Sequence, residues 1–404
     1  MFAARLEDQI LICIARRSLD DSNANRLRRL LRSDLDWEYL LETADRHCLT
    51  PLLYMHLSGL AFGAVPPRVL SRLGDANYQN TQSGFVLAGE LLKILECFKA
   101  NNIDAVPFKG PTLALSVYGD VGLRQFADLD VLVRKPDVPR VKELLIACGF
   151  KPTPELTTAQ QAALLRFDCA CNFDNGHGVV LDLHWRFVEP HSALVFDPGP
   201  LWDRLEPVTM GGKHLMTLSP EDLLLVLCLH GFTHFWERLG WICDVAGLMD
   251  QNKNFDWQLV LENANRLGMR RILLLGLVLA ADVLDAAMPI EIEQIASGDA
   301  VVKRLAHEIK EQLFKKESSL PGLFSGAVLS LNMRERKRDK FRSCFRLVTT
   351  PRRYDWLAVS LPDSLFFLYY VLRPVRLAGK YGAQLLKGSQ NGGTPNKADK
   401  RELS

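Results

Sequence analysis

Hydrophobic and polar positions follow a helical period through the first quarter of the chain and again through its second half. Up to about residue 100, apolar residues recur every three or four positions, as in RLRRLLRSDLDWEYLLETADRHCLTPLLYMHL. The same period returns at Ser219 and continues to about Gly382. Ser219 is placed to cap the first of these later helices, with Pro220 in its first turn and Asp222 near its positive end. We therefore expect helices before about residue 100 and after Ser219, with a region of another structural type between them.

The central part, between about residues 103 and 217, is rich in short β-type runs. They are IDAVPF, DLDVLV, CACNFD, VVLDLHWRF and HLMTLS, separated by glycines and by one helical segment, VPRVKELLIACGF. This pattern predicts an α+β fold with a small mixed sheet inserted between two helical regions. The expected units are an N-terminal helical region 1–100, an α/β domain 101–218, a helical C-terminal domain 219–385 and a disordered tail 386–404.

Two helical segments resemble each other. DWEYLLETADRHCLTPLL from Asp36 and DWQLVLENANRLGMRRIL from Asp256 share Asp-Trp, Leu-Glu, Ala and Arg at matching offsets. An ancient repeat is one explanation. The other, which we favour, is that both are amphipathic helices whose tryptophan packs on the same kind of surface.

Composition describes an ordinary globular chain. Of its 404 residues 48% are hydrophobic and 24% charged, enough to bury two or three cores, and a net charge of +2 does not indicate a nucleic-acid partner for the whole chain. Nine cysteines without a CxxC pair indicate reduced thiols and a cytoplasmic location. Glu7 and Asp8 stand where a signal peptide would be apolar, and no apolar stretch reaches the roughly 20 residues of a membrane span.

The stretch FKGPTLALSVYGDVGLRQFADLDVLV, Phe108 to Val133, carries the first candidate chemistry. Lys109 and Gly110 form a turn between a predicted strand and a predicted helix that begins near Pro111. Such a turn brings free backbone N–H groups and the positive end of a helix next to the lysine cation, which suits a phosphate. Lys-Gly turns before helices are common, so this signal alone is not specific.

Three aspartates add a second signal. Asp128 and Asp130 project from one face of a strand, and two carboxylates this close repel unless a cation lies between them. Mg²⁺ or Mn²⁺ would fit, and Asp182 on a later strand completes the cluster of a two-metal phosphoryl-transfer site, as general base or as the ligand nearest the acceptor. The alternative is a pair of strand-end carboxylates that face solvent or cap a turn after Phe126. His184 either orients Asp182, contacts the acceptor or is an ordinary strand histidine, which we favour.

This order of elements resembles the DNA-polymerase-β-like nucleotidyltransferase superfamily. More narrowly, the Phe108–Val133 stretch resembles the KG-(x)n-Y-(x)n-R-x-x-x-D-x-D-x-L-V signature of a group of predicted bacterial nucleotidyltransferases, some of them linked to exopolysaccharide or peptide-product gene sets. The resemblance covers about residues 20 to 385, because that group also has a His-Gly-(x)n-Trp-(x)n-Asp helix and an Arg-Pro near its C-terminal end.

The resemblance implies metal-dependent transfer of a nucleoside monophosphate from an NTP to an acceptor, with release of pyrophosphate. By position, Asp128, Asp130 and Asp182 would hold the metals, and Lys109 with Gly110 would lie under the phosphates. The superfamily usually has a Gly-Ser turn whose hydroxyl contacts the triphosphate. Because Lys-Gly replaces it here, the details of nucleotide binding and the group transferred stay open.

Arg124, four residues before Asp128, matches an arginine of the resembling group. It either binds phosphate through both guanidinium arms or forms an ion pair with Asp128 or Asp120. Tyr118, at the end of the predicted helix, is more typical of a packing residue with a hydrogen-bonded hydroxyl.

A second group of polar and aromatic residues lies in LCLHGFTHFWERLGWICDVAGLM. At helical spacing His230, His234, Arg238 and Trp241 share one face, and Asp244 extends it. This face either covers the nucleotide, with tryptophan stacking and arginine on phosphate, or contacts the acceptor. The alternative is a buried polar network between domains. A zinc site is not expected, because the glutamate of HExxH is missing.

The segment NMRERKRDKFRSCFRLVTTPRRYDW, residues 332–356, is strongly basic, with interleaved Phe341 and Phe345. It would suit RNA, an anionic glycan or a membrane surface, although solvated helices also carry many arginines. The following LPDSLFFLYYVLRPVRLAGKYG is aromatic and ends in cations, which fits either peripheral membrane contact or closure of the helical core.

Three functions follow as hypotheses. The favoured one is an active nucleotidyltransferase that uses an NTP and an unidentified acceptor, which could be a small molecule, glycan, peptide or RNA. The second is a nucleotidyltransferase toxin that modifies tRNA. The third is a catalytically silent nucleotide-binding protein, against which the intact Asp128, Asp130 and Asp182 argue.

Overall fold

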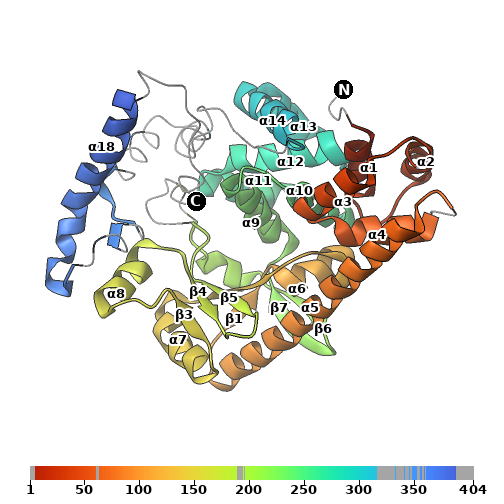
Figure 1. Cartoon of the computed structure of the whole chain (residues 1–404). Coiled ribbons are helices and arrows are strands. Elements are labelled where there is room, and N and C mark those ends of the chain that lie inside the picture. The colour runs from red at the N-terminus through yellow and green to blue at the C-terminus, as the bar shows by residue number, and fades with distance from the viewer. Residues whose placement is uncertain are drawn as a thin grey trace.

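A computed structural model describes residues 5–60, 63–188, 194, 196–315, 333, 341, 345, 348–352, 355, 356, 359 and 361–387 (Figure 1). Helices come first along the chain, as the sequence pattern predicts. They are α1 (Leu6–Ile14), α2 (Asp21–Leu30), α3 (Trp37–Arg46), α4 (Thr50–Leu60) and the long α5 (Pro67–Ala100).

A five-stranded mixed sheet follows, which confirms the predicted α+β class. Its strands are β1 (Ala105–Pro107), β2 (Asp128–Val133), β3 (Lys151–Thr153), β4 (Ala170–Asp174) and β5 (Val180–His184), in the order β1-β2-β5-β4-β3. The central pair, β2 and β5, is parallel, and the other pairs are antiparallel. The predicted run HLMTLS forms β7 (Lys213–Thr217), which pairs with β6 (Glu206–Met210) in a separate hairpin.

The helices within the strand region only partly match the prediction. The segment after Lys109 is helical, as α6 (Gly110–Leu113) and a wider π-type turn (Ala114–Tyr118). The predicted VPRVKELLIACGF helix is α7 (Val138–Ala147). A second helix, α8 (Thr158–Phe167), was not predicted, although it has a capping box in which Thr157 and Gln160 each bond the backbone N–H of the other.

Helices return after β7. They are α9 (Pro220–Thr233), α10 (Leu239–Gln251), α11 (Trp257–Leu267), α12 (Arg270–Leu284), α13 (Ile290–Gly298), α14 (Ala300–Gln312) and α18 (Tyr369–Lys387). The predicted cap of α9 is confirmed, because the Ser219 hydroxyl accepts a hydrogen bond from the backbone N–H of Asp222 at 3.3 Å. The Asp222 carboxylate in turn binds Arg204 with both oxygens.

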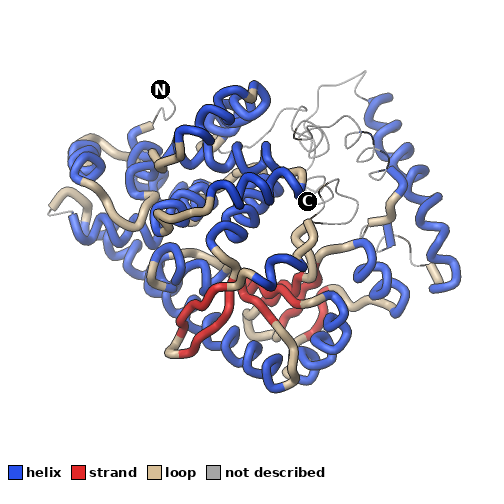
Figure 2. The backbone as a smooth tube through the Cα atoms, turned by 180° about the vertical axis from the view of Figure 1, so that it is seen from behind, coloured by secondary structure: helices blue, strands red, loops and turns tan. Residues whose placement is uncertain are grey.

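Two hydrophobic cores organise the molecule. The larger joins α1–α4 to α9–α14, so helices before and after the sheet share one interior, while Tyr369 of α18 packs in the smaller core. The smaller lies between the sheet, through Leu129, Val131 and Leu181, and the helices α5 and α7. Figure 1 shows α5 and α7 on one side of the sheet and α9–α12 on the other, and Figure 2 shows the strands gathered at one end of a largely helical body. The proposed domain boundaries at 100/101, 218/219 and 385/386 stay predictions.

The two similar segments form the same helix–turn–helix hairpin. Asp36 and Asp256 each cap a helix with nearly the same backbone angles, φ −78°, ψ 85° and φ −77°, ψ 82°. The hairpins also share a turn bond of 2.8 Å, from Leu49 to Ala44 and from Met269 to Ala264. Both tryptophans pack against the larger core, which supports the favoured explanation, and an ancient repeat stays a hypothesis.

The C-terminal predictions are only partly covered by the described residues. Most of the basic segment 332–356 and the tail beyond Lys387 lie outside them, while Phe341 and Phe345 are exposed. Within the described part of the chain, no helix combines the length and the apolar character that a bilayer crossing requires.

A buried histidine should make stability depend on pH. His47 joins α3 to α4, and its Nδ1 accepts a 3.0 Å hydrogen bond from the backbone N–H of Leu239 at the start of α10. Burial, and then the charges of Arg46 and Arg238, lower the pKa of His47 to about 3. Because the unfolded state takes up the proton first, stability is lost as pH falls below about 6.5, by up to about 1.4 kcal/mol per pH unit, until about pH 3.

We expect His47→Asn, which keeps an acceptor near the Nδ1 position but cannot titrate, to lose less stability than wild type between pH 7 and pH 5. Urea unfolding at several pH values measures this difference. Equal slopes for the two proteins would contradict the assignment to His47.

Candidate active site

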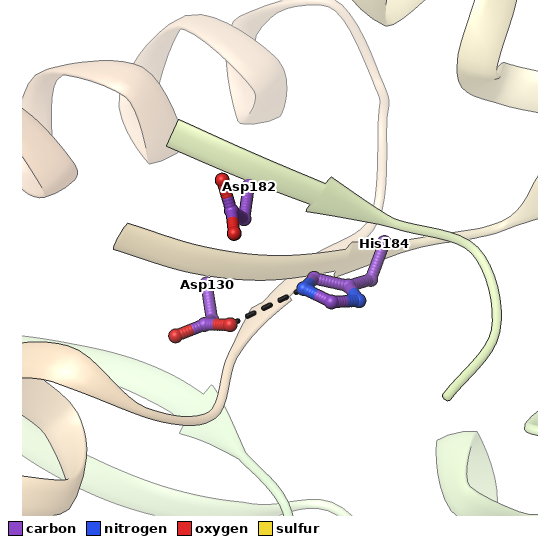
Figure 3. A group of neighbouring side chains, drawn as sticks. All are labelled: Asp130, Asp182 and His184. Carbon is purple, nitrogen blue, oxygen red and sulfur yellow. Dashed lines mark hydrogen bonds and ion pairs between the residues drawn. The ribbon is translucent and has the colours of Figure 1, made fainter. Parts of the chain in front are cut away.

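The predicted acidic residues meet on one face of the sheet. Asp130 of β2 lies directly opposite Asp182 of β5, because these parallel strands pair Asp130 with Asp182 in register. One ligand atom each from Asp130, Asp182 and His184 lie within 4.8 Å of one another (Figure 3). Asp128, two residues earlier on β2, shares the face by strand alternation but stands opposite Val180, outside this closest group.

Asp130 is the most buried of the three aspartates and has two partners. Its Oδ1 binds the Lys109 ammonium at 2.8 Å and His184 Nε2 at 3.2 Å, and only 2% of its side chain is exposed. His184 therefore contacts Asp130, not Asp182 as one prediction had it. The oxygen of Asp182 is instead bound by the amide of Asn172 at 2.6 Å.

The electrostatics of the cluster favour a divalent cation. Burial, together with the charge of Asp130, raises the pKa of both Asp128 and Asp182. Burial would raise the pKa of Asp130 too, but Lys109 and His184 outweigh it and hold that pKa below its usual range. Three carboxylates thus face one ammonium, and His184 Nδ1 is buried without a hydrogen-bond partner. Hard oxygen donors with an excess of negative charge fit Mg²⁺ or Mn²⁺.

Gly110 allows the lysine turn to approach the strand. Its φ is +55°, a left-handed conformation, and a Cβ there would lie 3.1 Å from the backbone oxygen of Asp128. A larger residue would push Lys109 away from the carboxylates. The structure therefore places both residues of the predicted turn at the cluster, with Lys109 held by Asp130.

A polar cavity of about 350 Å³ opens beside the cluster. Its wall combines the two groups of residues that the sequence singled out. It is lined by Lys109, Arg124, Asp128, Asp130, His230, His234, Arg238, Trp241 and Asp244, among others. Asp182 is not among the residues that line the cavity.

The prediction that His230 to Trp241 form one helical face is wrong. Helix α9 ends at Thr233, and Phe235 and Trp236 take left-handed φ values of 56° and 53° before α10 begins at Leu239. The break accommodates Trp236, whose buried ring lies against Gly231 and Gly276, two residues that have no side chain. A Cβ on Gly231 would lie 2.5 Å from its ring, and one on Gly276 3.2 Å.

The broken helix still gathers the predicted side chains. Ring centroids lie 4.6 Å apart for His230 and His234, and 5.3 Å and 5.2 Å from these to Trp241. The Arg238 guanidinium carbon lies 5.4 Å from the Trp241 centroid. Burial, and then the nearby Lys109 charge, lower the pKa of both histidines, so each presents a neutral imidazole.

Arg124 has a partner that the sequence did not suggest. It binds Asp244 of α10 through Nε and Nη2, both at 3.0 Å, rather than Asp128 or Asp120. Tyr118, predicted to be a packing residue with a bonded hydroxyl, is confirmed as one and donates to the same Asp244 at 2.8 Å. Burial opposes the charge of Arg124, but Asp244 outweighs it and raises the arginine pKa. The pair joins the two walls of the cavity.

Asn172 and Cys48 were missed by the sequence analysis. Asn172 is one of several polar residues on β4, and no spacing marks it as a partner of Asp182. Cys48 lies in the α3–α4 turn at φ 58° and receives a hydrogen bond from Arg238 at 3.4 Å. The first contact depends on the antiparallel register of β4 and β5, which pairs Asn172 with Asp182, and the second joins segments 190 residues apart, so only the fold reveals them.

A mixed sheet with aspartates on its two central parallel strands, after a lysine-glycine turn, has the layout of a nucleotidyltransferase domain. A family described as uncharacterised nucleotidyltransferase matches residues 33–285, a narrower range than the expected 20–385. The chain therefore belongs to this family.

Individual proteins are only weakly similar to the chain. No curated protein matches the chain. Among solved structures, the antibiotic-resistance factor ANT(2'')-Ia is 13% identical, with a TM-score of 0.33 over 45% of this chain and 92% of its own. An antigenic nucleotidyltransferase-like protein from Paracoccidioides brasiliensis is 16% identical, with a TM-score of 0.26 over 52% of this chain and 94% of its own.

The Arg124–Asp244 pair should be costly to break from one side. Asp244→Ala leaves a buried guanidinium without its carboxylate, and we expect it to lower the free energy of unfolding by about 3–5 kcal/mol. Arg124→Met combined with Asp244→Ala removes both charges and should lose less than Asp244→Ala alone. Urea unfolding of the two single variants, Asp244→Ala and Arg124→Met, and of the double variant measures this coupling. A double variant whose loss of stability equals the sum of the two single losses would contradict a coupled pair.

Proposed function

We propose that the protein is an active, metal-dependent nucleotidyltransferase that transfers a nucleoside monophosphate from an NTP to an acceptor. The observation that carries the proposal is Asp130 opposite Asp182 across parallel strands, with Asp128 on the same face, beside a 350 Å³ cavity. A structural role alone does not explain three carboxylates placed together where burial raises the pKa of two of them.

The proposed metal ligands are Asp128, Asp130 and Asp182, with His184 within reach. Bound Mg²⁺ or Mn²⁺ would neutralise phosphate charge and lower the pKa of the acceptor hydroxyl. The chain supplies the geometry, since the register of β2 and β5 fixes the carboxylates before any ligand binds.

The proposed nucleotide site is the cavity. Its volume is within the range of small-molecule pockets. Trp241 offers a face for the base, and the neutral imidazoles of His230 and His234 can hydrogen-bond its edge. Arg238 beside Trp241, and Lys109, which Gly110 holds close to the strand, provide charge for the phosphates.

Asp182 is the proposed general base. It pairs with Asp130 across the parallel strands and is not among the residues that line the cavity, and Asn172 binds one of its oxygens. The acceptor oxygen attacks the α-phosphorus and forms a new P–O bond, while the bond to the pyrophosphate oxygen breaks. The proton of the acceptor goes to Asp182, whose raised pKa suits a proton acceptor.

Calorimetric titration with ATP, GTP, CTP and UTP, with and without Mg²⁺, tests the site. We expect at least one nucleotide to bind only with metal, and the Asp128→Ala, Asp130→Ala double variant to lose at least about a hundredfold in affinity because it removes two metal ligands. Asp250→Asn, at an exposed carboxylate, is the matched control and should bind normally. No metal-dependent binding by wild type would favour the silent scaffold.

Labelled nucleotide then identifies the acceptor class. We expect transfer of α-labelled, but not γ-labelled, phosphate to a component of a small-molecule, glycan or peptide extract, because the pyrophosphate leaves with the γ-phosphate. Label appearing in tRNA would instead support the toxin hypothesis. An Asp182→Asn variant that binds nucleotide but does not transfer it would support the role of Asp182 as base.

A further inference from the structure

The ammonium of Lys109 binds one of the two carboxylate oxygens of Asp130, a proposed metal ligand. Lys109 Nζ lies 2.8 Å from Asp130 Oδ1, and His184 Nε2 lies 3.2 Å from the same atom. The surroundings are nearly dry, with 13% of the Lys109 side chain and 2% of the Asp130 side chain exposed. Asp130 is therefore neutralised within the chain itself.

An ammonium and a divalent cation cannot share this position. Like charges repel strongly where little water screens them, and Oδ1 already accepts from two donors. A metal ion that binds Asp130 through Oδ1 must displace Lys109. The displaced ammonium, partly buried, then needs another anion.

The cavity offers few places for that ammonium. Its neighbour Asp244 is held by Arg124 and Tyr118, so it is already neutralised, and Asp128, which also lines the cavity, is a proposed ligand of the same metal ion. The lysine stem is long and flexible, and Lys109 itself lines the cavity in which the nucleotide is proposed to lie. The triphosphate is the anion that would enter together with the metal.

We propose that Lys109 exchanges partners, from Asp130 in the free protein to the triphosphate in the metal–nucleotide complex. This inference rests on the proposed function and adds its binding order. Metal alone takes as its ligands the carboxylates that Lys109 faces, and nucleotide alone must pull Lys109 away and leave Asp130 without its cation. Only the two together give both Asp130 and Lys109 a partner of opposite charge, so metal and nucleotide bind cooperatively, each increasing the affinity of the other by the same factor.

The variant Lys109→Met tests the exchange because it is an unbranched side chain only one atom shorter and removes the charge. We expect Mn²⁺ alone, measured by electron paramagnetic resonance of the free ion, to bind about tenfold tighter to the variant, since its competitor is gone. The nucleotide that binds in the calorimetric series should, with Mn²⁺ present, bind about tenfold weaker, since it loses one charged contact.

The exchange predicts that Lys109→Met binds Mn²⁺ more tightly and nucleotide more weakly, and simpler roles of the lysine do not predict both changes. A lysine that only holds the fold would weaken both measurements, and one that only contacts phosphate would leave the affinity for Mn²⁺ alone unchanged. Either result overturns the exchange. Lys253→Met, at an exposed lysine paired with Asp250, is the matched control and should change neither affinity.

A separate variant shows which proposal fails. Asp130→Asn should abolish binding of Mn²⁺ to both wild type and Lys109→Met. If Mn²⁺ binds equally well after Asp130→Asn, the metal site is elsewhere and the proposed function loses its main support. If Asp130→Asn abolishes binding but Lys109→Met does not strengthen it, the site stands and the exchange is wrong.

A measurement on wild type covers the case in which Lys109→Met does not fold. Acetylation of Lys109 by an N-hydroxysuccinimide ester, followed by mass spectrometry of its peptide, reports how free the amine is. We expect slow reaction without ligands, at least about threefold faster reaction with Mg²⁺ alone, and slow reaction again with Mg²⁺ and nucleotide together. No acceleration by Mg²⁺ in a protein that binds Mg²⁺ would overturn the proposal.

Discussion

The buried charge of Asp130 is the constraint around which the site is built. A carboxylate with 2% of its side chain exposed must have a cation and hydrogen-bond donors, because burying it alone would cost far more free energy than the domain has to spare. The chain meets this demand with Lys109 and His184. Gly110 takes a left-handed backbone so that the lysine can reach, and β5 lies parallel to β2 so that the histidine can.

The buried carboxylate of Asp244 is a second constraint, on the side of the cavity formed by α10. Asp244 of α10 gathers Arg124 and Tyr118, which come from the segment between the lysine turn and β2. His47 binds the start of α10 from the N-terminal helices. The N-terminal helices and the segment before β2 therefore both bind α10, which lines the cavity, through buried polar contacts. Each contact joins segments that are more than 100 residues apart along the chain.

The strands and the acidic cluster could be predicted because their signals are local. A period of two places Asp128 and Asp130 on one face whatever the rest of the chain does, and Asp182 stands out in an otherwise apolar strand. The helix break after Thr233 could not be predicted, because it depends on a slot for Trp236 that is completed by Gly276, 40 residues further on. The Arg124 partner was missed for a similar reason, since proximity in sequence favoured Asp120 and Asp128 over Asp244.

Helix α5 has a mechanical consequence for the cavity. Its 34 residues span about 50 Å, and its two ends belong to different cores: Val69 and Leu73 pack in the larger one, Leu91 and Phe98 in the one beneath the sheet. The helix therefore fixes the distance between the helical body and the face of the sheet that carries the acidic cluster. A ligand that needed a larger cavity could not separate the two cores without deforming α5. The cavity would therefore adjust through its side chains and through the short turn between α9 and α10.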